Sequence, residues 1–284
     1  MPNSKISRTT PETQEDFDWV APVGTLGRLT AAAWDRSRAL EESAEVDGLA
    51  PDDGLPRPSL VDALRRDHVA VIAEMKRMSP SKGAINPGLA SDRQAKLYAA
   101  GGAAALSVLT EPTSFGGSNE DVELARAAGL PILKKDFHVS DAQLMEARSL
   151  GASAALIIVR AIDPRRLAGL AETARRISME LLFEVRDERE LRRALEVGAV
   201  MIGVNNRNLE TLVIDHDTVS RIVPLIPAGC VAVAESGYFT PDDVLSAAAA
   251  GADAVLIGSA LSSAADPAAA VRLLSGISRR ARHS

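Results

Sequence analysis

The chain has 284 residues, of which 46% are hydrophobic, and a formal net charge of −6 at neutral pH. It is long enough to bury a large core, and its charge gives no electrostatic reason to expect nucleic acid or an anionic membrane as a partner. Two Trp, two Tyr and five Phe are too few for a base-stacking platform. The composition favours an enzyme or a small-molecule binding protein.

The N-terminal part has two kinds of sequence. Residues 1–23 are polar, contain three prolines and show no sustained period, which predicts a disordered tail. A helical stripe then follows on Leu26, Leu29, Ala33, Ser37 and Leu40. It predicts a helix over residues 26–44 that lies across one end of the following domain. Prolines at 51, 56 and 58 indicate a linker, and residues 59–66 form one more predicted short helix.

From residue 67 onward one pattern repeats: a helix-like segment ends in a glycine pair or Gly-Ala, and a short apolar run follows directly. It occurs at Gly101-Gly102, Gly151, Gly198 and Gly251. Glycine there is typical of a left-handed helix C-cap, and an apolar run without alternation is typical of a parallel strand buried on both faces. The pattern predicts successive β/α units.

The apolar runs predict eight strands, over 69–75, 106–109, 131–133, 156–159, 181–185, 201–204, 230–234 and 255–257. Residues suited to cap a helix N-terminus stand between them at Ser140, Asp163, Asp187 and Thr240. The predicted fold is an α/β protein, a (β/α)8 TIM barrel with an N-terminal helical extension. A doubly wound open sheet is the alternative. We divide the chain into a tail (1–23), the helical extension with its linker (24–66) and the barrel (67–284).

The cysteine count and the absence of targeting signals shape the expected setting of the protein. The single cysteine, Cys230, excludes an intramolecular disulfide, and with four scattered histidines it forms no Cys/His metal site. We expect it to be a buried apolar residue in a strand. No segment has the length of a transmembrane helix and no signal-peptide core is present, so the expected location is cytoplasmic, without nucleic acid, membrane or metal.

Chemistry in such a barrel lies where the strands end. The predicted strand ends carry Glu74 and Lys76, Lys134 and Lys135, Glu184, Asn205 with Arg207, and Glu235. Charged groups at these places are costly unless they are paired or functional. The β-pleat puts Glu74 and Lys76 on one face, toward the mouth of the barrel, and requires one of the adjacent lysines to face outward. A purely structural ion pair is the alternative for Glu74 and Lys76.

Two loops have the features of an anion site. Ser236-Gly237 and Gly258-Ser259 follow the seventh and eighth strands, where barrels commonly bind a phosphate. Glycine permits close approach and the serine hydroxyl adds a donor. Ordinary tight turns are the alternative.

Several motifs occur together and in a fixed order. They are Glu-Met-Lys-Arg at 74–77, Ser-Pro-Ser-Lys-Gly at 79–83, Phe-Gly-Gly at 115–117, Lys-Asp-Phe at 135–137, Asn-Asn-Arg-Asn-Leu at 205–209 and Ala-Glu-Ser-Gly at 234–237. Over about residues 60–275 the chain resembles indole-3-glycerol phosphate synthase of tryptophan biosynthesis. The resemblance implies a carboxy-lyase that needs no cofactor. Its reaction closes 1-(2-carboxyphenylamino)-1-deoxyribulose 5-phosphate to indole-3-glycerol phosphate, with loss of carbon dioxide and water.

The resemblance also implies roles for the catalytic side chains. Lys135 is similar to the general acid that protonates the ribulose carbonyl oxygen. Glu184 matches the glutamate that acts as base or stabilises the cationic intermediate. Lys76 matches the lysine that holds the substrate carboxylate, with Glu74 to orient it.

Further matches concern substrate binding. Asn205, Arg207 and Glu235 resemble polar groups around the anthranilate and the ribulose hydroxyls. The phosphate cradle is matched by Ser79, Gly237, Gly258 and Ser259, with Ser236 beside them, and the apolar walls by Phe115, Phe137 and Leu156. The implied partner is a small phosphorylated molecule. The sequence does not define the oligomeric state, for which a monomer is the expectation.

The chemistry of this ring closure also requires an acid and a carboxylate. Ring closure puts positive charge on the anilino nitrogen and negative charge on the carbonyl oxygen, so the site needs a carboxylate and an acid. Lysine suits the acid if its pKa is lowered, and we expect burial or the neighbouring Lys76 to lower the pKa of Lys135.

Other functions remain open at the level of sequence. His138 and Tyr238 stand where the family more usually has aliphatic residues, which leaves room for an altered rate or for a secondary metabolic pathway. An aldolase-like enzyme would use Lys135 or Lys76 as a Schiff-base nucleophile. A barrel without activity that serves as a partner subunit is the non-enzyme alternative.

Overall fold

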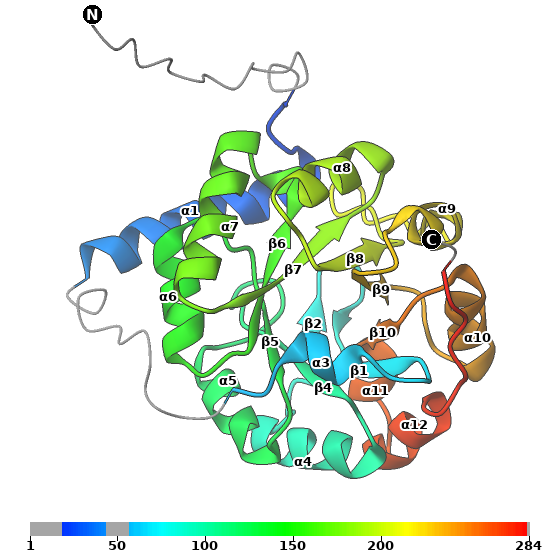
Figure 1. The fold of residues 1–284 in the computed structure, drawn as a ribbon. Helices are drawn as coiled ribbons and strands as arrows, with labels where there is room; N and C mark the ends of the chain where they lie inside the picture. The colour runs from blue at the N-terminus through cyan, green and yellow to red at the C-terminus, as the bar shows by residue number, and fades with distance from the viewer. Residues whose placement is uncertain (1–18, 44–56, 283–284) are drawn as a thin grey trace, which may run out of the picture.

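Eight parallel strands close into a barrel in which β1 pairs with both β4 and β10 (Figure 1). The computed structural model describes residues 19–43 and 57–282. The barrel strands are β1 (Ala70–Met75), β4 (Ala105–Leu109), β5 (Ile132–Lys135), β6 (Ala154–Ile158), β7 (Glu180–Val185), β8 (Met201–Asn205), β9 (Val231–Glu235) and β10 (Ala254–Ile257). The predicted (β/α)8 barrel is confirmed, and the open-sheet alternative is wrong.

Helices surround the barrel and follow the strands in chain order (Figure 1). They are α4 (Ser91–Gly101), α5 (Glu120–Ala125), α6 (Asp141–Ser149), α7 (Pro164–Arg176), α8 (Glu188–Glu196), α9 (Asp217–Ile222), α10 (Pro241–Ala250), α11 (Ser259–Ser262) and α12 (Pro267–Leu274). Short 3-10 turns occur at η2 (Arg126–Ala128), η3 (Val159–Ala161) and η4 (Val223–Leu225). A small hairpin of β2 (Met78–Ser79) and β3 (Gly83–Ala84) lies between β1 and α4.

Local sequence signals set the ends of these helices. The side chains of Ser140, Asp163, Asp187 and Thr240 each accept a hydrogen bond from the backbone amide three residues later, as expected of N-caps. Gly102 and Gly251 end α4 and α10 in the left-handed conformation, each at φ +92°. The four helices with these N-caps begin, and α4 and α10 end, where the sequence predicts, and the apolar runs that follow α4 and α10 enter the barrel.

In the part of the N-terminal extension that the structure describes, two helices are present, and they lie at opposite ends of the barrel. Helix α1 (Gly24–Glu42) packs against α6 and η3, and its Leu29 reaches the carboxyl end of the strands. Helix α3 (Leu60–Leu64) lies at the amino end, where Glu180 at the start of β7 accepts hydrogen bonds from the amides of Leu60 and Val61. The predicted linker prolines at 51 and 56 lie outside the described residues.

The structure describes the last five residues of the predicted tail, 19–23. Residues 1–18 lie outside the description, whereas residues 19–23 contact the loops after β6 and β8. The Trp19 indole nitrogen is 3.4 Å from the Arg160 carbonyl oxygen, and the Val23 amide donates to a carboxylate oxygen of Glu210 at 3.0 Å. Among the helices of the described residues, none has both the length and the apolar character needed to cross a bilayer.

Candidate active site

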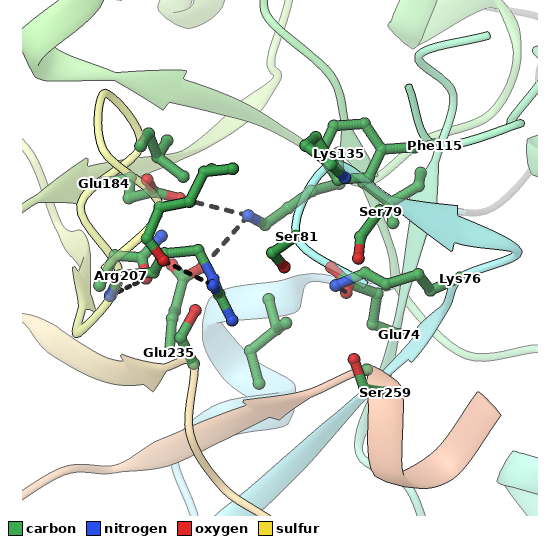
Figure 2. Close-up of a pocket in the computed structure, with 18 of the residues that line it drawn as sticks. Glu74, Lys76, Ser79, Ser81, Phe115, Lys135, Glu184, Arg207, Glu235 and Ser259 are labelled. Atoms are coloured by element: carbon green, nitrogen blue, oxygen red, sulfur yellow. Dashed lines mark hydrogen bonds and ion pairs between the residues drawn. The ribbon is translucent and has the colours of Figure 1, made fainter. Parts of the chain in front are cut away.

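A pocket opens at the carboxyl end of the barrel (Figure 2). It is lined by every site residue expected from the sequence: Glu74, Lys76, Ser79, Phe115, Lys135, Phe137, Leu156, Glu184, Asn205, Arg207, Glu235, Ser236, Gly237, Gly258 and Ser259. These residues follow strands that are far apart in the sequence. Because parallel strands of a closed barrel all end at the same rim, their terminal side chains meet there.

Lys135 is the centre of a buried ionic cluster. Its Nζ atom lies 3.2 Å from Oε2 of Glu184 on β7 and 3.1 Å from Oε2 of Glu235 on β9. The adjacent Lys134 points the other way, toward α6, where its Nζ atom lies 3.1 Å from a carboxylate oxygen of Glu146. The alternation predicted for these two lysines is confirmed, and Lys135 is the one that enters the pocket.

The carboxylates change the acid–base properties of this cluster. Burial lowers the pKa of Lys135, but attraction to Glu235, Glu184 and Glu74 outweighs it, so the pKa is raised above its ordinary value. The expectation that burial or Lys76 would lower the pKa of Lys135 is therefore wrong. The expectation failed because the sequence does not show how closely the carboxylates of Glu184 and Glu235 approach the Lys135 ammonium group in space.

The pKa of Glu235 is raised as well, and here burial is the main cause. Burial raises its pKa to about 8, with Lys135 opposing the shift and Glu184 adding to it. Its Oε1 atom is buried and has no hydrogen-bond partner among the described residues. A side chain on Gly203 of the neighbouring β8 would collide with this oxygen, so the glycine leaves the space that the carboxyl group occupies. This oxygen therefore lies against the backbone of β8, whereas Oε2 of the same carboxyl group faces Lys135.

Glu74 and Lys76 form a second ion pair at the mouth. Glu74 Oε1 and Lys76 Nζ are 2.5 Å apart, and both residues line the pocket, while Met75 between them is buried. A Cβ atom on Gly258 would meet both charged groups. Glycine at this position thus allows the loop after β10 to approach the ion pair closely.

Asn205 and Arg207 form the rim after β8. The Asn205 side-chain oxygen accepts a hydrogen bond from the Arg207 amide at 2.9 Å. Arg207 donates to the Leu212 carbonyl at 2.8 Å, and burial lowers the pKa of its guanidinium. These contacts hold a cationic side chain at the pocket wall opposite Lys76 and Ser79 (Figure 2).

The loop after β9 has an unusual backbone. Ser236 has φ +65° and Gly237 has φ +91°, two consecutive residues in the left-handed region. A non-glycine residue in that region carries strain, and such strain is often found at functional sites. Together with Gly258 and Ser259 after β10, the loop lines the pocket.

The apolar side of the pocket is formed by two phenylalanine rings and a leucine. The ring centroids of Phe115 and Phe137 are 6.4 Å apart and tilted by 39°. Leu156 on β6 continues this wall. A flat aromatic ring fits beside such a surface, because its faces are apolar.

Several pocket residues were not expected from the sequence. Leu109 and Ile158 pair in register with Lys135 and Glu184, so the strand alternation that singled out the charged residues could have found them. Thr25 and Leu29 on α1, the hairpin residues Pro80 to Lys82, and Tyr238 with Phe239 also line the pocket. No local pattern indicates that α1 reaches the site.

The two departures from the family pattern have different positions. His138 is buried behind the wall, with its Nδ1 atom 2.9 Å from the Leu156 carbonyl oxygen. Burial, aided by Lys134, lowers its pKa to about 3, so the ring is neutral. Tyr238 lines the pocket itself, with its hydroxyl 3.5 Å from the Asn206 amide nitrogen. Only Tyr238 can touch a bound molecule.

The pocket combines cationic, anionic and apolar side chains. In the part of the chain that the structure describes, no three His, Cys, Asp or Glu side chains are grouped so as to hold a metal ion. The charged groups instead combine ammonium and guanidinium donors with buried carboxylates and an apolar wall. This arrangement can bind an anionic aromatic compound and exchange protons with it.

Comparison with known proteins gives a family and relatives. A model described as indole-3-glycerol phosphate synthase matches residues 35–274. The chain is 49% identical over 213 residues to the indole-3-glycerol phosphate synthase of Parafrankia sp. (strain EAN1pec), covering 75% of this chain and 79% of the relative. It is 45% identical over 257 residues to indole-3-glycerol phosphate synthase 2 of Streptomyces coelicolor, covering 89% and 99%. A solved 3-hexulose-6-phosphate synthase superimposes with TM-score 0.59 at 17% identity, over 72% of this chain and 98% of that one, which shows the fold alone.

Proposed function

The chain belongs to the indole-3-glycerol phosphate synthase family, and from this premise we propose how its pocket carries out the ring closure of tryptophan biosynthesis. The substrate is 1-(2-carboxyphenylamino)-1-deoxyribulose 5-phosphate, and the products are indole-3-glycerol phosphate, carbon dioxide and water. The observation that carries the proposal is the position of Lys135, a buried ammonium between two carboxylates and beside an apolar wall.

The first step joins two carbon atoms of the substrate. The ring carbon that bears the carboxylate attacks the ribulose carbonyl carbon, and the carbonyl oxygen gains negative charge. Lys135 donates its proton to this oxygen, and Glu184 stabilises the positive charge on the anilino nitrogen. The raised pKa keeps Lys135 protonated until the developing alkoxide, a stronger base than the carbonyl, takes the proton.

The later steps remove carbon dioxide and water. Lys76 holds the substrate carboxylate, with Glu74 to orient its ammonium group at 2.5 Å. Decarboxylation returns its electron pair to the six-membered ring, which becomes aromatic again. The former carbonyl oxygen then leaves as water after a second protonation, and the adjacent carbon bound to the ring nitrogen loses a proton, which forms the double bond of the indole. A proton on Glu235, whose pKa burial raises to about 8, is available near neutral pH for this exchange. Asn205 and Arg207 bind the hydroxyl groups and the anthranilate part.

The ends of the substrate are bound by separate parts of the pocket. Ser79, Ser236, Gly237, Gly258 and Ser259 bind the phosphate through backbone amides and hydroxyls. Phe115, Phe137 and Leu156 face the anthranilate ring. Two binding regions of different chemistry orient one flexible molecule, which favours attack within it.

A direct assay tests this function. The protein is mixed with the synthetic substrate, and the indole fluorescence of the product is recorded together with released carbon dioxide. We expect both signals in equal amounts. Borohydride added with substrate should trap no covalent adduct, because the proposed Lys135 acts as an acid and not as a Schiff-base nucleophile. Absence of product, or a trapped adduct on Lys135, would contradict the proposal.

The setting of the enzyme is part of the proposal. A substrate with a phosphate and a carboxylate does not cross a bilayer unaided, because its charges are costly to bury in hydrocarbon. We therefore propose that the enzyme works in the compartment that contains its substrate, the cytoplasm. All proposed groups come from one chain, which fits a monomer. Cell fractionation and the mass measured by size-exclusion chromatography with light scattering test these two points.

A further inference from the structure

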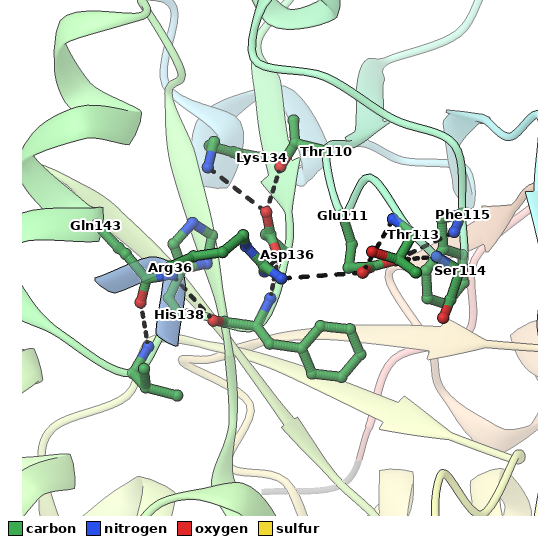
Figure 3. Close-up of polar contacts among 12 residues, drawn as sticks. Arg36, Thr110, Glu111, Thr113, Ser114, Phe115, Lys134, Asp136, His138 and Gln143 are labelled. Carbon is green, nitrogen blue, oxygen red and sulfur yellow. Dashed lines mark hydrogen bonds and ion pairs between the residues drawn. The ribbon is translucent and has the colours of Figure 1, made fainter. Parts of the chain in front are cut away.

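The apolar wall of the pocket is held from behind by polar groups (Figure 3). The Phe115 amide donates to Oε2 of Glu111 at 3.1 Å, and the Phe137 amide donates to Oδ1 of Asp136 at 2.7 Å. Glu111 also accepts from the amides of Thr113 and Ser114, at 3.2 and 2.6 Å. One carboxylate thus fixes the loop of Phe115, and another fixes the backbone of Phe137.

One side chain from outside the barrel connects these two carboxylates. Arg36, on helix α1, places Nη2 at 2.7 Å from Oδ1 of Asp136 and Nη1 at 3.8 Å from Oε1 of Glu111 (Figure 3). Glu111 is fully buried, and Asp136 is 6% exposed. Within the described residues, Arg36 is the one cation paired with Glu111, whereas Asp136 also has Lys134 at 3.8 Å.

A buried carboxylate depends strongly on its cation, because removal of one partner leaves an uncompensated charge. Glu111 and Asp136 lie on different strand ends, after β4 and β5, and the planar guanidinium spans both. Lysine has one ammonium group and lacks the two separate terminal nitrogens with which Arg36 reaches Glu111 and Asp136. Arg36 therefore sets the relative position of the two loops.

We propose that Arg36 is a positioning residue that fixes the gap between Phe115 and Phe137, and so the fit of the anthranilate ring, from the N-terminal extension. The proposal rests on the proposed function, since it assigns the aromatic part of the substrate to this wall. It adds that the extension is part of the specificity for aromatic carboxylates. Among the described residues, Arg36 makes its hydrogen bond and ion pairs with Glu111 and Asp136, and none with the phosphate region after β9 and β10.

The test compares three variants. Arg36→Met removes the ion pairs with Glu111 and Asp136. Arg36→Lys keeps the positive charge but lacks the planar guanidinium group. Arg38→Met is the matched control, because Arg38 lies on the same helix, is 62% exposed and pairs with the exposed Asp35. The probe is the reduced substrate, in which a hydroxyl replaces the ribulose carbonyl so that it binds without cyclising. Inorganic phosphate is the second probe.

We expect Arg36→Met to weaken binding of the reduced substrate about tenfold and to lower kcat by about tenfold or more. The reason is that a small displacement of the substrate relative to the catalytic groups lowers the rate by such a factor. Binding of inorganic phosphate should stay within about twofold of wild type. Amide hydrogen exchange at Ser114 and Phe115 should become faster. Arg36→Lys should show the same changes at reduced size, and it also covers the case in which Arg36→Met does not fold.

Two results would overturn the role of Arg36. One is equal affinity of Arg36→Met and Arg38→Met for the reduced substrate. The other is an equal loss of affinity for reduced substrate and phosphate, which would mark a general structural defect. A wild-type protein that forms no indole product would contradict the proposed function instead, and the binding and exchange measurements would still decide the role of Arg36.

Discussion

The Nζ atom of Lys135 lies 3.2 Å from Oε2 of Glu184, although the strands that carry them, β5 and β7, are separated in the barrel by β6. Glu184 is 3% exposed, so the contact is made in a region largely shielded from water. An acid and a carboxylate at this distance can act on two atoms of one substrate molecule.

Replacing Lys135 by methionine should lower kcat at least about a hundredfold, the lower end for loss of a general acid, with a smaller effect on KM. Lys96→Met, on the exposed face of α4, is the control and should keep wild-type turnover. Stopped-flow fluorescence of product formation measures both. Turnover of Lys135→Met close to that of Lys96→Met would remove Lys135 from the mechanism.

Replacing Glu184 by glutamine should lower kcat about a hundredfold or more while the melting temperature stays within a few degrees of wild type. Loss of the Glu184 charge removes one cause that raises the pKa of Glu235, so Glu235, 3.1 Å from Lys135, ionises more readily and compensates the ammonium group. The exposed Glu172→Gln on α7 is the control. Calorimetry and kinetics on one preparation measure the melting temperature and kcat. A much lower melting temperature with normal kcat would show that Glu184 is only a structural partner of Lys135.

Replacing Gly258 by alanine should lower kcat/KM more than about tenfold, because the added methyl group collides with Glu74 and Lys76. Inorganic phosphate should compete with substrate in the wild type and inhibit this variant less. Gly169→Ala on α7, where a Cβ atom meets open space, should be as active as wild type and as stable or more so. Steady-state kinetics in the presence of phosphate test this prediction. Equal kcat/KM and equal inhibition by phosphate in the two variants would show that the phosphate binds elsewhere.

Replacing Glu235 by glutamine should change how stability depends on pH. The pKa of Glu235 is raised from 4.5 to about 8, so between these values the folded protein holds a proton that the unfolded chain has released. Its contribution to the free energy of unfolding therefore falls as pH rises through that range. The variant should gain more than about 1 kcal/mol relative to wild type between about pH 5 and about pH 8.

Urea unfolding at several pH values measures this difference, because titration of all other groups is common to both proteins. Glu172→Gln controls for loss of a carboxylate on the surface. A wild-type and variant difference that does not vary with pH would show that Glu235 releases its proton at its ordinary pKa.

The charged strand ends were predictable because their signal is local. Glu74 and Lys76 share a face by the two-residue period of a strand, and Lys135 and Glu184 stand out as charges beside apolar runs. The same rule, applied to Leu109 and Ile158, would have added two further pocket residues. The order of the strands around the barrel then follows from chain connectivity.

The sequence by itself determined the repeating β/α units, the helix caps and the set of polar groups at the strand ends, since each depends on residues a few positions apart. Only the tertiary structure decided the direction of the Lys135 pKa shift and the reach of Arg36 to Glu111 and Asp136. The physical reason is that electrostatic energy depends on distance and burial in space. Those quantities exist only once the barrel has brought separate strand ends, and the helix before them, to one rim.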